Sequence, residues 1–237
     1  VIMIKVRSFI FYLGMFLFTI PFTLISLFTF PLAQKHRYRF ISLWAKTMIP
    51  WLKFTCNLSF EIHGSENIPN KPCIVFCNHQ SAWETLALQI ALPQQVWVLK
   101  RELLMIPFFG WGLWLTSPIA IDRSSGKKAL LQMFNQGLTK IQKGFFIIVF
   151  PEGTRANLNE DKKYHIGGSW LAKKIDCPVL PIAHNAGYFW PKNSFLKHPG
   201  KITLKIGPLI ETHELSTDQI NESAKKWINS NVEKIIH

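Results

Sequence analysis

The 237 residues are enough for one α/β domain with a complete core and one additional segment. Lysine and arginine outnumber aspartate and glutamate by 27 to 14, and the formal net charge of +13 implies an anionic partner: nucleic acid, anionic lipid or a phosphorylated substrate. A hydrophobic content of 48%, with 9 tryptophans and 19 phenylalanines, argues against a nucleic-acid-binding protein and favours the membrane.

The N-terminal stretch is the first predicted element. No charged residue occurs from Ser8 to Gln34, which is long enough for a membrane-spanning helix of about 20 residues. Pro21 and Pro31 interrupt the stretch, and basic residues flank both of its ends, so both ends favour the cytoplasmic side. A helical hairpin in one leaflet and a single tilted span both remain open. A cleaved signal peptide is disfavoured, because its apolar region would be shorter.

The next segment, from Phe40 to Trp51, has an apolar side and lysines on other faces, which predicts an amphipathic helix at the membrane interface. We therefore expect a membrane-anchoring segment at residues 1–53 and a folded domain at residues 54–237. The cysteines Cys73 and Cys77 lie in an apolar run, without a C-x-x-C pair, and are expected in the core of a protein in a reducing environment.

Strands and helices alternate in the domain. Strands are predicted at Leu58–Ile62, Cys73–Asn78, Gln95–Leu99, Phe145–Phe150, Val179–Ala183 and Lys201–Ile206. Helices are predicted around Glu84, from Gly126 to Lys143 and from Ser216 to Ile236, with a short helix and a strand within Leu103–Ile121. This order predicts an α/β fold: a mostly parallel sheet flanked by helices, preceded by a membrane-embedded helical segment. Sites in such sheets lie at the carboxyl ends of the strands.

Polar residues follow the strand ending near Cys77 directly. His79 has the side chain best suited to take a proton from a hydroxyl group and return it, because its pKa lies near neutrality. A carboxylate on the other ring nitrogen would fix the tautomer and stabilise the imidazolium, and Glu84 is the nearest candidate. On one regular helix the two side chains would lie about 140° apart. We therefore expect His79 in the turn before a helix and Glu84 in its first turn.

The same residues allow a structural interpretation. Ser81 and Glu84 form a capping-box pattern before the apolar residues 86–88, with Ser81 as the N-cap. Glu84 would then stabilise the start of the helix rather than orient His79. The rest of the chain is needed to choose between these interpretations.

Several segments, in their order and spacing, resemble the motif blocks of the 1-acyl-sn-glycerol-3-phosphate (lysophosphatidic acid) acyltransferase family. They are Asn78-His79-x-x-x-x-Glu84, Lys100-x-Glu102-Leu103 with Pro107 and Gly110, Ile121-Asp122-Arg123, Phe150-Pro151-Glu152-Gly153-Thr154-Arg155 and Val179-Leu180-Pro181-Ile182. The resemblance covers residues 58–208. The sequence departs from the family at Glu84, where aspartate is usual, and the extra methylene requires a slightly different backbone position.

The resemblance implies transfer of an acyl chain from an acyl thioester, acyl-CoA or acyl carrier protein, to the sn-2 hydroxyl of lysophosphatidic acid, giving phosphatidic acid in phospholipid biosynthesis. It implies His79 as general base, Glu84 as its orienting group, and phosphate binding by Glu152, Gly153, Thr154 and Arg155. A guanidinium forks onto phosphate oxygens, and a glycine lets backbone amides approach an anion. Further candidates for phosphate binding are Lys100, Arg101 and Arg123. No metal or cofactor is expected, because the further ligands of a zinc site are missing from the motif.

Three alternatives remain at this stage: an acyltransferase for another lysophospholipid or polar acceptor, a lipid thioesterase, and a non-catalytic membrane protein that binds anionic lipid. The pairing of His79 with the 152–155 loop favours an enzyme, since a passive binder has no need for it. The expected partners are lysophosphatidic acid, the acyl thioester and anionic membrane lipids, not nucleic acid. The catalytic domain is expected on the cytoplasmic face of a membrane, the inner one in a bacterium, with residues 103–115 as a wall of the acyl tunnel.

Overall fold

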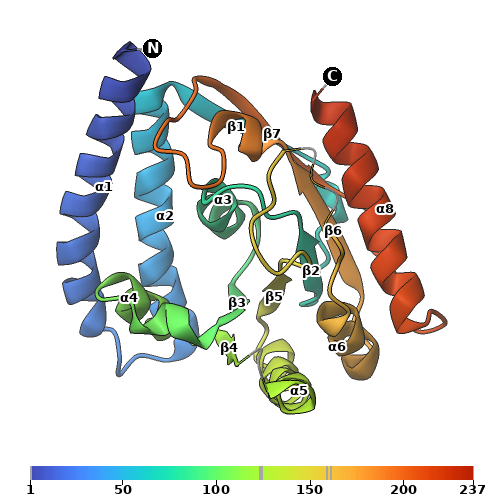
Figure 1. Cartoon of the computed structure of the whole chain (residues 1–237). Helices are drawn as coiled ribbons and strands as arrows, with labels where there is room; N and C mark the ends of the chain where they lie inside the picture. Colours follow the sequence, from blue (N-terminus) through green and yellow to red (C-terminus); the bar gives the residue numbers. More distant parts are fainter. Residues whose placement is uncertain (1, 123–124, 159, 161, 237) are drawn as a thin grey trace.

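A mostly parallel sheet forms the centre of the computed structural model, which describes residues 2–122, 125–158, 160 and 162–236 (Figure 1). Within these residues the sheet has seven strands in the order β1-β7-β6-β2-β5-β3-β4. The strands are β1 (Leu58–His63), β2 (Ile74–Cys77), β3 (Gln95–Lys100), β4 (Ile119–Ile121), β5 (Phe146–Val149), β6 (Val179–His184) and β7 (Gly200–Ile206). Neighbouring strands are parallel except for the antiparallel pair β6 and β7. The predicted α/β fold class is confirmed.

Helices cover both faces of this sheet (Figure 1). In chain order they are α1 (Ile2–Leu27), α2 (Gln34–Cys56), α3 (Trp83–Ala91), α4 (Phe109–Leu115), α5 (Lys127–Gln142), α6 (Gly167–Ile175), α7 (Ala186–Phe189) and α8 (Thr217–Ile236), with 3₁₀ turns at Ser65–Asn67 and Arg101–Met105. Helices α5, α6 and α8 pack together on one face, whereas α3 and α2 lie on the other, with α1 outside α2.

The central strands are buried and apolar, and the segments that follow them are polar. All residues of β2 and β5 are buried, as their continuous apolar sequences predict for strands covered on both faces. Cys73 and Cys77 are fully buried free thiols, so the prediction that they are core residues is confirmed. Because β2, β5 and β3 are parallel neighbours, the polar segments that follow them meet at one edge of the sheet.

The N-terminal segment forms two long helices packed side by side (Figure 1). Pro21 lies inside α1 and does not end it, contrary to the expected interruption, while Pro31 lies in the turn between α1 and α2. Helix α2 extends to Cys56, and Tyr38, Met48 and other buried side chains join it to the domain core. Its apolar side is therefore shared between the domain and the exterior, where Leu43 and Phe54 are exposed.

Helix α1 presents apolar side chains to its surroundings. Phe9, Phe16 and Leu17 are among its exposed large residues, and the helix is long and apolar enough to cross a membrane. In a water-soluble protein, a surface helix would turn such apolar residues toward the core. The exposed apolar side chains of α1 are therefore typical of a helix in contact with lipid.

A buried lysine fastens α1 to the segment after α7. Lys197 is 1% exposed, and its ammonium group lies 3.8 Å from the ring centre of Tyr12 and 4.4 Å from that of Trp190. Its Nζ donates to the hydroxyl of Tyr12 at 2.5 Å and to the carbonyl of Phe195 at 2.8 Å, and its backbone N–H donates to Ser8 Oγ. Aromatic rings and carbonyl oxygens thus surround the charge.

Candidate active site

The residues that follow β2 form the centre of the site. His79 lies in the turn after the strand, and Glu84 lies in the first turn of α3, as predicted. Nδ1 of His79 is 2.6 Å from Oε1 of Glu84. An acceptor at this distance keeps the proton on Nδ1 and leaves the lone pair of Nε2 free to accept a proton from another molecule.

Glu84 also organises the start of α3. The backbone N–H of Ser81 donates to Oε1 of Glu84 at 3.0 Å, and Oγ of Ser81 accepts the N–H of Trp83 at 3.1 Å. The predicted reciprocal contacts are therefore present. Ala82, not Ser81, stands at the N-cap position before Trp83, but its backbone angles are near-helical and its side chain makes no cap, so Ser81 makes the capping contacts from one residue earlier. The two interpretations of Glu84 are compatible: one carboxylate oxygen serves both the helix and the histidine.

The carboxylate of Glu84 is fully buried. Burial by itself raises the pKa of Glu84, but the hydrogen bond with His79 and the neighbouring imidazoles outweigh burial and hold the pKa below its usual value. The site therefore contains a buried negative charge beside the proton-accepting histidine. The extra methylene relative to aspartate does not prevent contact with His79.

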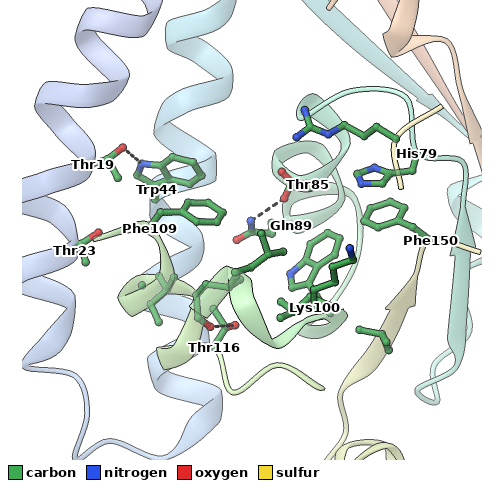
Figure 2. A pocket seen from close by; sticks show the side chains of 18 of the residues that line it. Thr19, Thr23, Trp44, His79, Thr85, Gln89, Lys100, Phe109, Thr116 and Phe150 are labelled. Carbon is green, nitrogen blue, oxygen red and sulfur yellow. Dashed lines mark hydrogen bonds between the residues drawn. The ribbon is translucent and has the colours of Figure 1, made fainter. Parts of the chain in front are cut away.

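Aromatic rings fix the plane of His79. Its imidazole stacks on Phe150, and Phe150 stacks in turn on Trp97 at 5.8 Å between ring centres. His79 and Phe150 follow the ends of β2 and β5, and Trp97 lies within β3, the next strand in the sheet. Figure 2 shows His79 above Phe150 at one end of a cavity. The stack limits rotation of the imidazole away from Glu84.

The loop after β5 is bound to the histidine segment through the backbone. Oε1 of Glu152 accepts the backbone N–H of His79 at 3.0 Å, and the N–H of Ala156 donates to the carbonyl of His79 at 2.6 Å. Burial raises the pKa of Glu152 to about 7. The structure thus places Glu152 behind His79, whereas Gly153, Thr154 and Arg155 line the cavity. Gly153 has a φ of +74°, which turns the loop toward this cavity at no steric cost.

A cavity of about 440 Å³ extends from His79 between the N-terminal helices and the domain (Figure 2). Its apolar wall includes Phe22 and Trp44 from the N-terminal helices, Trp97 from β3, and Leu103 and Phe109 from the 103–115 segment. Residues of the 103–115 segment therefore line this cavity, and their role as a wall of the acyl tunnel stays a prediction. A mostly apolar cavity with a few polar groups in its wall suits a molecule with a hydrocarbon chain and a polar reacting group.

Three cationic residues are among those that line the cavity. Lys100 at the end of β3 and Arg155 line it, as does Lys192 in the segment after α7. Arg101 is exposed, begins the 3₁₀ turn and is not among the lining residues, and Arg123 lies outside the described residues. Lys162 donates to Oγ1 of Thr154 and to the carbonyl of Arg155, which supports the loop from outside.

Comparison with known proteins agrees with this geometry. A model of the acyltransferase family matches residues 59–185, which include both polar loops. A 1-acyl-sn-glycerol-3-phosphate acyltransferase from Pseudomonas aeruginosa is 40% identical over 235 residues, which cover 97% of this chain and 91% of that protein. The chain belongs to the 1-acyl-sn-glycerol-3-phosphate acyltransferase family.

Other members of the family share the same region. The 1-acyl-sn-glycerol-3-phosphate acyltransferase of Saccharomyces cerevisiae is 30% identical over 181 residues, which cover 74% of this chain and 59% of that protein. The crystal structure of the 1-acyl-sn-glycerophosphate acyltransferase PlsC from Thermotoga maritima superposes with a TM-score of 0.81 at 24% identity, covering 99% of this chain and 96% of that one. The two chains share one fold, including the N-terminal helices.

Two residues of the acyltransferase site were not predicted. Lys192 joins the cavity from a segment without a recognisable pattern, and His184 lies at the end of β6 beside Asn78. No spacing in the sequence relates His184 to His79 or Glu84, because contact arises from the pairing of β6 with β2. Only the strand order could have indicated it.

Proposed function

We propose that this chain transfers an acyl group from acyl-CoA or an acyl carrier protein to the sn-2 hydroxyl of lysophosphatidic acid, forming phosphatidic acid for phospholipid biosynthesis. The observation that carries the proposal is one cavity that is lined by His79, by cationic side chains and by many apolar side chains. The reaction requires a base, a phosphate site and space for acyl chains, and the cavity offers groups suited to each.

His79 acts as the general base in this mechanism. Its Nε2 accepts the proton of the acceptor hydroxyl while the hydroxyl oxygen attacks the thioester carbon. The tetrahedral intermediate then expels the thiolate, which takes the proton back from His79. Glu84 keeps Nδ1 protonated, and its buried charge stabilises the imidazolium between the two steps. The proposed route needs neither a metal nor an organic cofactor beyond the thioester itself.

Arg155 and Lys100 bind the phosphate of the acceptor. Both line the same cavity as His79. The planar guanidinium can donate two parallel hydrogen bonds to phosphate oxygens, whereas the ammonium contributes a point charge. Thr154 offers a hydroxyl donor in the same loop, and Gly153, whose N–H donates to the carbonyl of Phe150 at 3.0 Å, turns the loop toward the cavity. Glu152 supports this loop through the backbone of His79.

The N-terminal helices hold the enzyme at the membrane. The exposed apolar face of α1 contacts lipid, and the basic residues at both ends of the apolar stretch favour anionic headgroups on the cytoplasmic side. An acceptor that resides in the bilayer then reaches the cavity without crossing bulk water.

A screen of donors and acceptors with purified protein in lipid nanodiscs tests the proposal. Acyl-CoA and acyl-acyl carrier protein are each combined with lysophosphatidic acid, lysophosphatidylcholine, lysophosphatidylethanolamine or glycerol 3-phosphate, with His79→Ala as the control. We expect phosphatidic acid and one equivalent of free thiol in the presence of lysophosphatidic acid. Thiol release without an acceptor would indicate a thioesterase, and a product from another acceptor alone would reassign the substrate.

A further inference from the structure

A second histidine lies next to the Glu84 carboxylate. His184, at the end of β6, is fully buried, and its Nε2 is 3.8 Å from Oε2 of Glu84. Among the described residues, Oε2 has no hydrogen-bond partner, although it is buried. The distance is too long for a hydrogen bond, but an N–H dipole at this range in a region of low dielectric constant still favours a negative charge.

The hydrogen bonds of His184 define its tautomer. The backbone N–H of Ala186 donates to Nδ1 at 3.1 Å, so Nδ1 is the unprotonated nitrogen. Nε2 therefore carries the hydrogen and donates to the carbonyl of Asn78 at 2.8 Å. Burial lowers the pKa of His184, which keeps the imidazole neutral.

The surroundings hold this imidazole in place. Both the backbone N–H and the carbonyl of His184 are bonded to the side chain of Asn78, at 3.0 and 2.9 Å. Trp83 packs against the ring at 63°. Among the described residues, the charged or titratable groups that act on His184 are Glu84 from α3 and His79 from the turn after β2, and its partner on β7 is the apolar Leu204. A neutral, fixed donor thus lies behind the catalytic pair.

We propose that His184 is a positioning residue for the acyl transfer: its Nε2–H keeps the Glu84 carboxylate ionised and directed toward His79. This inference depends on the proposed function, because it assigns a role within that reaction. Oε1 accepts hydrogen bonds from His79 and Ser81, whereas Oε2 accepts none from the described residues and lies 3.8 Å from Nε2 of His184. The dipole of the neutral Nε2–H group favours the negative charge on Oε2 without adding a net charge. A protonated His184 would instead compete with His79 for the carboxylate.

The first test compares His184→Phe and His184→Gln with wild type in the nanodisc assay. We expect kcat to fall roughly tenfold in the phenylalanine variant, as when an outer partner of a functional histidine is lost. The acid limb of the pH profile should move to lower pH, because a less well-oriented carboxylate stabilises the His79 imidazolium less. KM for both substrates should stay unchanged, since His184 does not line the cavity. The glutamine variant, which retains an N–H donor, should recover part of the rate.

Ile182→Val is the matched control, because it removes one buried methyl group from the same strand and should leave the pH profile unchanged. A double-mutant cycle combines His184→Phe with Glu84→Gln. In the Glu84→Gln background, His184→Phe should lower kcat only slightly further. A folded His184→Phe protein with wild-type kcat and pH profile, or effects that multiply independently in the cycle, would overturn the inference. An inactive wild type would instead contradict the proposed function.

Nitrogen-15 spectra of wild-type protein labelled at histidine provide a measurement that does not depend on a variant folding. His184 should remain a neutral Nε2–H tautomer across the pH range in which kcat rises. An imidazolium at His184 in that range, or the Nδ1–H tautomer, would contradict the proposed role.

Discussion

The imidazole of His79 lies flat on the ring of Phe150, with 4.0 Å between their centres and 11° between their planes. The two residues follow adjacent parallel strands, so the stack connects the two polar loops of the site. Orientation of a general base within about 1 Å can change rates by roughly 100-fold. The ring of Phe150 is therefore expected to matter for turnover as well as for packing.

Phe150→Leu should lower kcat by about tenfold or more with little change in KM, because the imidazole gains freedom to rotate away from Glu84. Steady-state kinetics in nanodiscs measure this. Phe134→Leu removes a similar amount of packing from α5, where Phe134 packs against Trp170, and should leave kcat unchanged. Equal losses of kcat in both variants would show that general stability, rather than the stack, sets the rate.

Glu84→Gln should reduce kcat by about 10² to 10⁴, because an amide can keep the hydrogen bonds but not the charge that balances the imidazolium. Glu84→Asp should retain much more activity, although its shorter side chain must still reach Nδ1 of His79, now at 2.6 Å. Circular dichroism spectra check that both variants keep the helix content of wild type. Equal activity in the two variants would show that the charge is dispensable.

Arg155→Ala should mainly raise KM for lysophosphatidic acid, since Arg155 lines the cavity and its guanidinium is suited to bind the phosphate. Loss of a charged hydrogen bond of about 1.5–3 kcal/mol corresponds to roughly a 10- to 150-fold increase. Lys128→Ala, an exposed cation on α5, is the control for a general change in surface charge. A rise confined to KM for the acyl donor would reassign the loop.

Gly112→Val should shift the donor preference toward shorter acyl chains. Gly112 lines the cavity from α4, and a Cβ atom there would lie 3.5 Å from Oγ1 of Thr23. Alanine is therefore accommodated, whereas the branches of valine occupy cavity space. Competition between acyl donors of different length measures the shift, with Gly112→Ala as the intermediate case. An unchanged preference in both variants would place the acyl chain elsewhere.

Lys197→Met should change how stability depends on pH. Burial lowers the pKa of Lys197 to about 7, whereas in the unfolded chain it is about 10.4. The unfolded chain therefore binds more protons between these values, so this lysine makes wild type more stable as the pH rises through that window. Melting temperatures of both proteins in detergent at pH 7 and 9.5 measure the difference. From pH 7 to pH 9.5 the melting temperature of wild type should rise relative to that of the variant. The same difference in melting temperature at both pH values would mean that Lys197 does not titrate in the folded protein.

Patterns in short stretches of sequence predicted the contact between His79 and Glu84 and the position of the 152–155 loop. A strand followed by a turn and a capped helix sufficed to place His79 beside Glu84, and the parallel strand order brought the 152–155 loop to the same edge. Pro21 was misleading, because a proline within a long apolar helix that packs on a neighbour need not end it.

The cavity could not be predicted in the same way. Thr23 of α1 and Gly112 of α4 face each other only after the N-terminal pair has docked on the domain. Lys192 reaches the cavity through a segment without regular structure, anchored nearby by Lys197. Such contacts depend on tertiary packing, which neither periodicity nor spacing encodes.

Helix α1 serves two environments at once. Its outward side exposes the apolar residues Phe9 and Phe16, whereas Thr19, Phe22 and Thr23 form part of the cavity wall. Deleting the helix to obtain a soluble enzyme would therefore remove one wall of the cavity and open the cavity to water. A water-soluble version would instead require polar substitutions on the lipid-facing side alone, with every cavity-facing residue of α1 retained.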